Sequence, residues 1–275
     1  MYLKSLTIQN FRRYSDAVTV NFDNLTAFIG KNDTGKSSVL EALDIFFNDN
    51  KGYVKLDKND INKTELANGN NEIIISACFD NLPPKVIIDA TNETTLADEY
   101  LLNEKHQLEI VKKYYNAANA KVFIRAYHPT NPACSNLLMK KDDELRKMIN
   151  SLGIECEDKA RNSVMRRDIW NHYADNLQLK TVDIDITKNI WDNLQIYLPM
   201  YTLFQADRKN TDSDNEVQDP LREAVKEILA DENLVATLQN VAQEVYPLRG
   251  WGLSPTLFLR LSLGCDQLVE PHLFA

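Results

Sequence analysis

Eight consecutive residues, Gly30-Lys-Asn-Asp-Thr-Gly-Lys-Ser37, have the types and the spacing needed to hold a polyphosphate. They match the pattern G-x-x-x-x-G-K-[ST] without a mismatch. Glycines let the backbone curl until successive N–H groups point at phosphate oxygens, and the positive end of a following helix adds to the same field. The pattern therefore predicts a loop that binds ATP together with Mg²⁺.

The positions of this loop have different expected roles. Lys36 is expected to reach the β- and γ-phosphates as a mobile ammonium group, and Ser37 to offer its hydroxyl to Mg²⁺. The residues between the glycines contribute mainly backbone groups. The alternative is a chance glycine turn before a helix. The predicted nucleotide-binding residues in this region are Gly30, Lys31, Asn32, Asp33, Thr34, Gly35, Lys36, Ser37 and Ser38.

The flanking segments have the patterns that such a loop requires. Residues 2–8 alternate apolar and polar side chains, which predicts a half-buried strand, and residues 18–22 predict a second one. Residues 25–29 are nearly continuously apolar, which is typical of a buried central strand. From Ser37 the apolar period becomes that of a helix, which ends near residues 48–50. Its apolar face is formed by Val39, Leu40, Leu43, Phe46 and Phe47.

The N-terminal segment also contains Ile8-Gln-Asn-Phe-Arg12, about twenty residues before the loop. A strand, then NFR, then a second strand, then GKNDTGKSS resembles the RecF/SMC/Rad50-like branch of ABC-type ATPases. The resemblance implies an α/β P-loop NTPase fold with a mixed sheet and helices. It also implies that Arg12, and with it Arg13, lies beside the phosphates or the ribose. The alternative is a solvated basic pair at the end of a strand.

Two later segments, PMYTLFQADR at 199–208 and DSDNEVQDP at 212–220, resemble the OLD family of ATP-dependent nucleases. The resemblance covers residues 1–48 and 199–245. In that family an ABC-type ATPase is followed by a Toprim nuclease domain, and some members are bacterial anti-phage effectors. The resemblance implies that the intact protein acts on DNA and forms a homo-oligomer through its ATPase.

Gln205 ends the strand that we predict at 199–205. ABC-type ATPases keep at this place the glutamine that senses Mg²⁺ and the attacking water. The resemblance therefore implies a catalytic and metal-related role for Gln205, with Asp207 or Arg208 as alternatives. A further alternative is that these three residues form a structural, salt-bridged turn.

Other parts of an ABC-type site are missing from the sequence. No acidic Walker B strand follows residue 208, and Leu261-Ser-Leu-Gly264 has only a chance likeness to a signature loop. Asp183-Ile-Asp185 and Asp212-Ser-Asp214 are expected to be polar turns rather than metal sites. We therefore expect an incomplete ATPase domain that binds ATP and hydrolyses it poorly or not at all. A RecF/SMC-like DNA-repair ATPase without a nuclease and a truncated nucleotide-binding regulatory product remain alternatives.

The chain is expected to contain four segments. They are an N-terminal ATPase lobe at 1–48, an α+β insertion at 49–198, a return strand with a long amphipathic helix at 199–245, and an atypical tail at 246–275. The periodicity within the insertion predicts strands at 72–79, 86–89, 107–115 and 121–127 and helices at 136–150 and 159–175.

Side chains elsewhere give weaker signals. The pairs Lys140-Lys141 and Arg166-Arg167 lie on predicted helices and are expected to be solvated faces, with a DNA or partner contact as the alternative. Histidines without ligand spacing are expected to lie at the surface or to be satisfied by hydrogen bonds. These are His106, His128, His172 and His272.

Composition excludes several classes of protein. The chain has 275 residues, of which 44% are hydrophobic and 26% charged, as in globular proteins. A net charge of −9 argues against a chain coated for non-specific nucleic-acid binding, although a local basic groove stays open. Without an apolar run of 18 residues, no transmembrane helix and no membrane partner are expected. The four scattered cysteines are typical of free thiols in a reducing cytoplasm.

Overall fold

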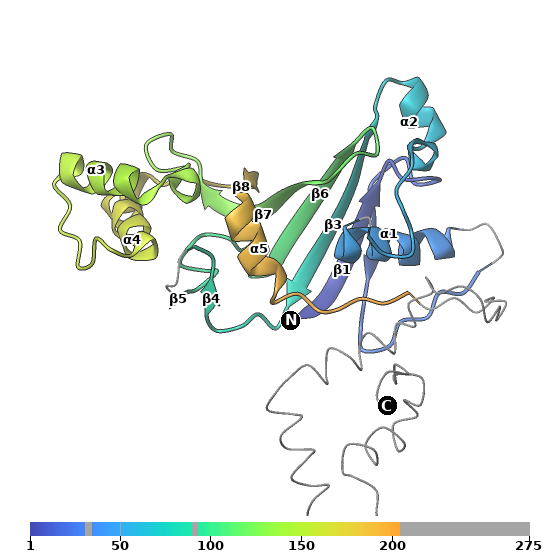
Figure 1. Ribbon diagram of the computed structural model, residues 1–275, viewed down its shortest axis with the longest axis horizontal. Helices are drawn as coiled ribbons and strands as arrows, with labels where there is room; N and C mark the ends of the chain where they lie inside the picture. The colour runs from blue at the N-terminus through green and yellow to red at the C-terminus, as the bar shows by residue number, and fades with distance from the viewer. Residues whose placement is uncertain (31–34, 50, 90–92, 204–275) are drawn as a thin grey trace, which may run out of the picture. The chain divides into compact units, whose positions relative to one another are not determined.

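Six strands form one antiparallel sheet, and its first two strands are those predicted at the N-terminus (Figure 1). The computed structural model describes residues 1–30, 35–49, 51–89 and 93–203, which belong to one unit, Met1–Leu203. The strand order is β2-β1-β3-β6-β7-β8, and each neighbouring pair is antiparallel. The strands are β1 (Tyr2–Gln9), β2 (Val18–Asn21), β3 (Glu72–Asp80), β6 (Leu108–Tyr115), β7 (Lys121–Pro129) and β8 (Leu179–Asp185).

The other elements are helices and one small hairpin, so the fold is α/β. The hairpin pairs β4 (Val86–Ile87) with β5 (Glu93–Thr94). The α-helices are α1 (Lys36–Asn48), α2 (Lys63–Ala67), α3 (Asp142–Leu152), α4 (Asn162–His172) and α5 (Lys188–Gln195). The short 3₁₀ helices are η1 (Lys58–Asp60), η2 (Leu137–Met139) and η3 (Ala174–Asn176).

The main core lies between the sheet and α1. Because strand side chains alternate between faces, Leu6 and Ile8 of β1 point to the same side. They belong to one buried cluster with Val39, Leu43 and Phe46 of α1, all 3% exposed or less. The helical period predicted from Ser37 is therefore confirmed, and the sheet holds the helix that follows the glycine-rich loop.

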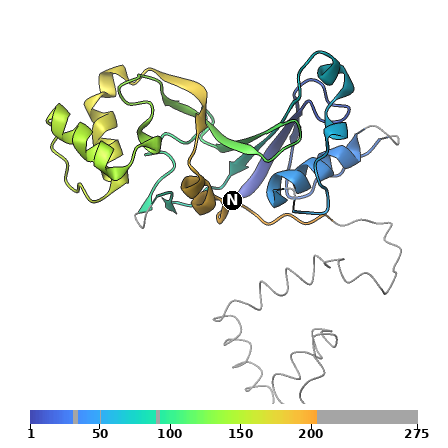
Figure 2. The same ribbon diagram turned by 45° about the horizontal axis from the view of Figure 1, so that its top comes forward.

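A second, smaller core lies within α3 and α4, which pack against each other at the β8 side of the sheet (Figure 2). Leu145 and Ile149 of α3 and Met165, Ile169 and Trp170 of α4 are all buried in this cluster. The periodicity at 136–150 and 159–175 correctly predicted these two helices, with ends shifted by a few residues.

The face of the sheet away from α1 has a ladder of ion pairs. Arg125 of β7 contacts Asp183 of β8 through Nε at 2.7 Å, and Lys113 of β6 contacts the same carboxylate at 2.8 Å. Lys121 pairs with Asp185 at 3.0 Å. The prediction that 183–185 forms a polar turn is therefore wrong, because these aspartates alternate along a strand whose neighbour supplies their cations.

The segment predicted as a buried central strand, Leu25–Ile29, is not a strand, and that prediction is wrong. Leu25 is 90% exposed and Ile29 is 95% exposed. A strand needs a ladder of hydrogen bonds from a neighbouring strand. Within residues 1–30, 35–49, 51–89 and 93–203, no strand pairs with this segment. Apolar sequence alone therefore did not determine its conformation.

The strand predicted from 199 to 205 is absent from its described part, because residues 199–203 have no regular structure. Tyr201 instead packs against α1, where its ring stacks on Phe47 at 5.7 Å and its hydroxyl donates to the carbonyl of Leu40 at 2.8 Å. Gln205, Asp207 and Arg208 lie outside the described residues, as do the segments predicted as a long helix and a tail. Among the described helices, none has the length and apolar character needed to cross a membrane.

Candidate functional site

The predicted phosphate loop ends where α1 begins. Gly35 precedes the helix with a φ of +92°, a left-handed conformation that glycine adopts readily. No side chain caps this end of α1, and its first turn contains no acidic residue. The first N–H groups of a helix have no partner within the helix, and they carry the positive end of its dipole. This end of α1 is therefore suited to an anion.

The two ends of the loop lie close together. The ammonium group of Lys36 donates to the carbonyl of Gly30 at 2.8 Å. Ser37 is exposed at the start of the helix, and Ser38 is buried beneath it. This contact brings Gly30 beside Lys36 at the start of α1, and the nucleotide-binding roles of Gly30, Gly35, Lys36 and Ser37 stay predictions. Residues 31–34, which contain the rest of the motif (Lys31, Asn32, Asp33 and Thr34), lie outside the described residues.

A tight turn after β1 supports the end of the loop. Phe11 and Tyr14 exchange backbone hydrogen bonds at 2.9 Å, which folds residues 11–14 back on themselves. The hydroxyl of Tyr14 then donates to the carbonyl of Gly35 at 3.1 Å. A Cβ atom at Gly35 would lie 2.7 Å from this hydroxyl and 3.0 Å from Cδ of Arg13. The turn therefore touches the loop at a position where only glycine fits.

The guanidinium of Arg12 lies between two carboxylates. Its Nε donates to Asp60 at 2.8 Å, and an Nη atom pairs with Glu41 of α1. The Arg12 side chain is 31% exposed and paired, so Arg12 is not freely solvated, whereas Arg13 is exposed. Arg12 thereby connects the turn after β1 to α1 and to η1, close to the start of the helix.

Two asparagines that the sequence analysis passed over hold this region together. Asn10 is fully buried, and its amide donates to the carbonyls of Asn70 and Glu72 at 3.1 and 3.0 Å. Its oxygen accepts from the backbone of Asn62, whose amide donates to the Arg12 carbonyl at 2.7 Å. Asn10 stands inside the NFR motif, and that is the only signal in the sequence that could have identified it.

The other end of α1 is held by side chains of β6. Lys112 is 1% exposed, and its ammonium donates to the carbonyl of Phe46 at 2.7 Å and pairs with Asp49. It also lies 4.6 Å from the centre of the Trp191 ring, a cation–π contact. Burial lowers the pKa of Lys112, and the charge of Asp49 opposes this shift. These contacts satisfy the last carbonyl groups of the helix that begins at the loop.

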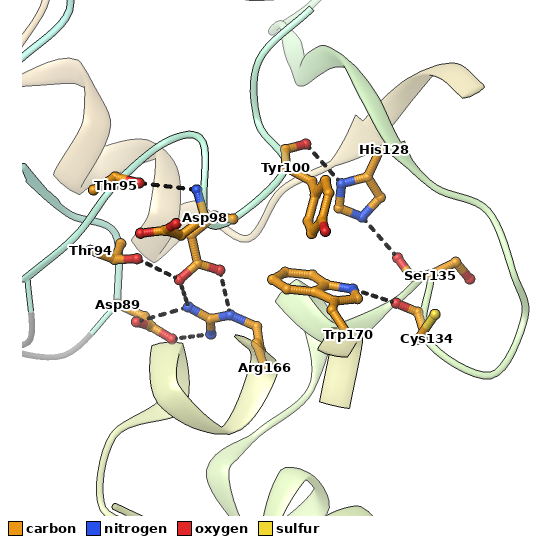
Figure 3. A network of polar contacts seen from close by, with 11 residues as sticks. Asp89, Thr94, Thr95, Asp98, Tyr100, His128, Cys134, Ser135, Arg166 and Trp170 are labelled. Carbon is orange, nitrogen blue, oxygen red and sulfur yellow. Dashed lines mark hydrogen bonds and ion pairs between the residues drawn. The ribbon is translucent and has the colours of Figure 1, made fainter. Parts of the chain in front are cut away.

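Arg166, which we expected on a solvated face, is 1% exposed, so that prediction is wrong. Its guanidinium pairs with the carboxylates of Glu99 and Asp89, and Figure 3 shows the contact with Asp89. Two nitrogens contact Glu99 at 2.7 and 2.8 Å. Burial lowers the pKa of Arg166, but the hydrogen bonds and charges of Glu99 and Asp89 outweigh burial and raise it above its usual value. The helical period placed Arg166 on α4, but the acidic partners come from a segment 67 to 77 residues away.

His128, whose ring lies near Trp170, has a structural role. His128 lies between the carbonyls of Tyr100 and Ser135, at 2.9 and 3.2 Å, and burial lowers its pKa (Figure 3). It is one of the satisfied histidines that the sequence analysis expected. Within the described ranges, no group of three His, Cys, Asp or Glu side chains could hold a metal ion. The chemistry that these residues can perform is therefore concentrated at the start of α1.

Comparisons with known proteins identify a family for most of the chain. The sequence matches the model of a family described as "AAA ATPase domain" over residues 1–248. It is 46% identical over 44 residues to the chromosome partition proteins Smc of Mycolicibacterium paratuberculosis and Mycobacterium leprae, which is 16% of this chain and 4% of theirs. It is 30% identical over 116 residues to an uncharacterized protein of Methanocaldococcus jannaschii, which is 41% of this chain and 31% of that protein.

The chain therefore spans less than a third of the length of the curated relatives it matches. One solved structure comes from work on ATP-driven dimerization and DNA-stimulated activation of SMC ATPases. It aligns with a TM-score of 0.33 and 15% identity, covering 55% of this chain and 99% of that one.

Proposed function

Because the chain belongs to the AAA ATPase domain family, we propose that it binds ATP and Mg²⁺ through Gly30–Ser37. The observation that carries this proposal is the junction of the loop with α1. There a left-handed Gly35, an uncapped helix start and the Lys36 ammonium converge without any acidic residue in the first turn. A chance glycine turn would not need this combination.

The residues present at this junction fit a Mg²⁺-bound triphosphate. The N–H groups at the start of α1 bind phosphate oxygens, and Lys36 exchanges its contact with the Gly30 carbonyl for the β- and γ-phosphates. Ser37 is exposed and offers a hydroxyl to Mg²⁺. The bound nucleotide supplies a phosphoanhydride bond, and the chain positions it. Arg12 leaves one or both of its carboxylates when it turns towards the phosphates.

Isothermal titration calorimetry with ATP and Mg²⁺ tests this proposal directly. We expect saturable binding by the wild-type chain and a loss of at least about tenfold in affinity for Lys36→Ala, since one charge-assisted contact to phosphate is removed. Lys55→Ala is the matched control, because Lys55 is an exposed lysine outside the loop. Equal affinities for Lys36→Ala, Lys55→Ala and the wild type would disprove the proposal.

We propose further that this chain alone hydrolyses ATP slowly or not at all. Phosphoryl transfer depends on positioning and charge stabilisation around the phosphates, including a group that orients the water. We assign that group to Gln205, with residues 199–245 returning to the ATPase, and the remaining groups to a second copy of the chain. A purified monomer that turns over ATP rapidly, with the rate lost in Lys36→Ala, would contradict this.

The larger biological role that we propose is that of the ATPase module of an OLD-like nuclease. Such a protein acts on DNA in the cytoplasm, forms a homo-oligomer through the ATPase, and serves in anti-phage defence. The support is the resemblance at 199–208 and 212–220, together with the family membership. The test is cleavage of plasmid DNA by the product of the complete gene, with and without ATP.

The similarity to Smc favours a second candidate, a DNA-clamping ATPase without nuclease activity. The 44 residues that are 46% identical to Smc proteins are the observation behind it. The two candidates differ in outcome. The nuclease cuts plasmid DNA, whereas the clamp retains circular DNA in an ATP-dependent manner and leaves it intact.

A further inference from the structure

A segment outside the sheet connects α1 to the lobe of α3 and α4. It consists of α5 and the residues that follow it, 188–201, and Figure 1 shows it running from α5 towards α1. We call this segment the strap. We propose that the strap couples the two regions, so that release of its end from α1 makes the lobe open more often. This coupling is separate from nucleotide binding and does not require it.

Tyr201 attaches the end of the strap to α1. Its ring stacks on Phe47 with the ring centres 5.7 Å apart and the planes 18° apart, and its hydroxyl donates to the Leu40 carbonyl at 2.8 Å. Residues 199–203 have no regular structure, and the neighbouring Met200 is 68% exposed. Because segments with few buried contacts open at a low free energy, this end can leave α1 while the rest of the fold stays intact.

The helical part of the strap is held more firmly and contacts the hairpin of β4 and β5. The buried residues of α5 belong to the main core. The amide of Asn193 donates to the carbonyl of Ile88 at 3.2 Å, and the hydroxyl of Tyr197 accepts from the backbone of Ile87 at 3.2 Å. The strap therefore fixes the position of the backbone at the end of β4.

The hairpin in turn places the carboxylates that hold Arg166 of α4. Asp89 directly follows Ile88 and pairs with Arg166 (Figure 3), while the hydroxyl of Thr94 donates to Glu99 at 3.0 Å. Arg166 is 1% exposed, so water cannot replace a carboxylate that moves away from it. A shift of Ile88 therefore weakens the contacts that hold α4 in place.

The sheet is a second connection between α1 and the lobe, and it differs from the strap. Lys112 of β6 holds α1, and His128 of β7 contacts the Trp170 ring in the lobe. Both strands lie in a ladder of backbone hydrogen bonds, and such core strands open at close to the free energy of global unfolding. The strap, by contrast, has an end that is either seated on α1 or released, and coupling between distant regions needs an element with two arrangements.

Hydrogen exchange followed by mass spectrometry tests this coupling, with the amides of β3 as the internal reference for global unfolding. Tyr201→Ala removes the stack and the hydrogen bond to α1. We expect the amides of α4 to exchange at least about fivefold faster in this variant, the low end of coupling between sites. Tyr14→Ala is the matched control, because Tyr14 also packs partly buried on the main core and donates to the Gly35 carbonyl at the start of α1, but is not part of the strap. It should leave exchange in α4 close to that of the wild type.

A double substitution shows whether the effect travels through the strap. Asn193→Ala removes the contact with Ile88 and leaves Tyr201 in place, so it should also speed exchange in α4. Effects of independent sites multiply in the exchange rate, whereas two changes along one connection do not. Adding Tyr201→Ala to Asn193→Ala should therefore have little further effect.

Circular dichroism checks that each variant folds. If Tyr201→Ala does not fold, Tyr201→Phe replaces it, because it keeps the stack on Phe47 and loses only the hydrogen bond to Leu40. A smaller rise is then expected in the same amides of α4.

Three results would overturn the coupling. The first is exchange in α4 that is the same in the Tyr201 variant as in Tyr14→Ala. The second is a rise that is equally large in β3, which would mean that the whole unit is destabilised. The third is a double variant whose exchange rate equals the product of the two single effects.

Discussion

Replacing the buried Arg166 by alanine should destabilise the lobe of α3 and α4 more than a single change at the surface of that lobe. Arg166 and Glu99 are each 1% exposed, and two short hydrogen bonds join them. Removal of the guanidinium leaves the Glu99 carboxylate buried without its cation. Breaking a buried pair in this way costs about 3–5 kcal/mol. Asp89 adds little to this cost, because its side chain is 20% exposed and water can hydrate it.

The assay is urea unfolding followed by tryptophan fluorescence. Trp170 lies one turn after Arg166 on α4, in the same buried cluster, so it reports on this lobe. Arg167→Ala is the matched control, because Arg167 is about half exposed and contacts the exposed Glu157 and the adjacent Asp168, whose side chain is 13% exposed. Pairs whose cation is in contact with water in this way contribute about 0–1 kcal/mol. The reasoning is refuted if Arg166→Ala costs no more than Arg167→Ala.

The same variant has a predicted pH dependence. Burial raises the pKa of Glu99 above its ordinary value of 4.5, and the loss of Arg166 removes the main opposing influence. A carboxyl whose pKa is higher in the folded state binds its proton more tightly there, so protonation favours folding. The destabilisation of Arg166→Ala should therefore be full at neutral pH and shrink as the pH falls through the raised pKa towards 4.5. If the difference in unfolding free energy between the wild type and Arg166→Ala stays constant or grows as the pH falls, this explanation is wrong.

Three further predictions concern α1 and its supports. Gly35→Ala should lower the free energy of unfolding by about 1–2 kcal/mol, because alanine is disfavoured at a left-handed φ, and it should weaken ATP binding. Adding Tyr14→Ala should recover the part of this loss that comes from steric contact with Tyr14, measured in a double-mutant cycle. Full additivity of the two changes would show that Tyr14 does not crowd this position. Lys112→Ala should cost about 1–3 kcal/mol in thermal unfolding, since a buried carbonyl of α1 and Asp49 lose their donor. Lys113→Ala should cost less, because the Lys113 side chain is 24% exposed and water can reach its partner Asp183. Glu41→Gln should weaken the hold on Arg12 and raise ATP affinity, measured by calorimetry, and an unchanged or lower affinity would show that Glu41 does not compete with the nucleotide.

Much of the fold follows from periodicity along the chain. Alternation at residues 2–8 predicted β1, because one face of that strand packs on a core and the other does not. Residues 72–79 were also predicted as a strand, and residues 75–77 of β3 are buried in succession, so both faces are covered there. The change to a helical period at Ser37 predicted α1 for a similar reason. β8 was missed because Asp183 and Asp185 look like turn residues until Arg125 and Lys121 of the neighbouring strand are seen beside them.

The sequence by itself predicted the phosphate loop and the helix after it, because the glycines, the lysine and the serine of the motif are expected to act through their own backbone and through that helix. The sequence could not determine the ion-pair partners of Arg12, Arg166 and Lys112, because these partners lie between 29 and 77 residues away along the chain. Each of these cations looks like a surface residue in its own segment. Only the tertiary structure brings the carboxylates to them, because the energy of a charge depends on the groups and the water around it in space rather than on its neighbours in sequence.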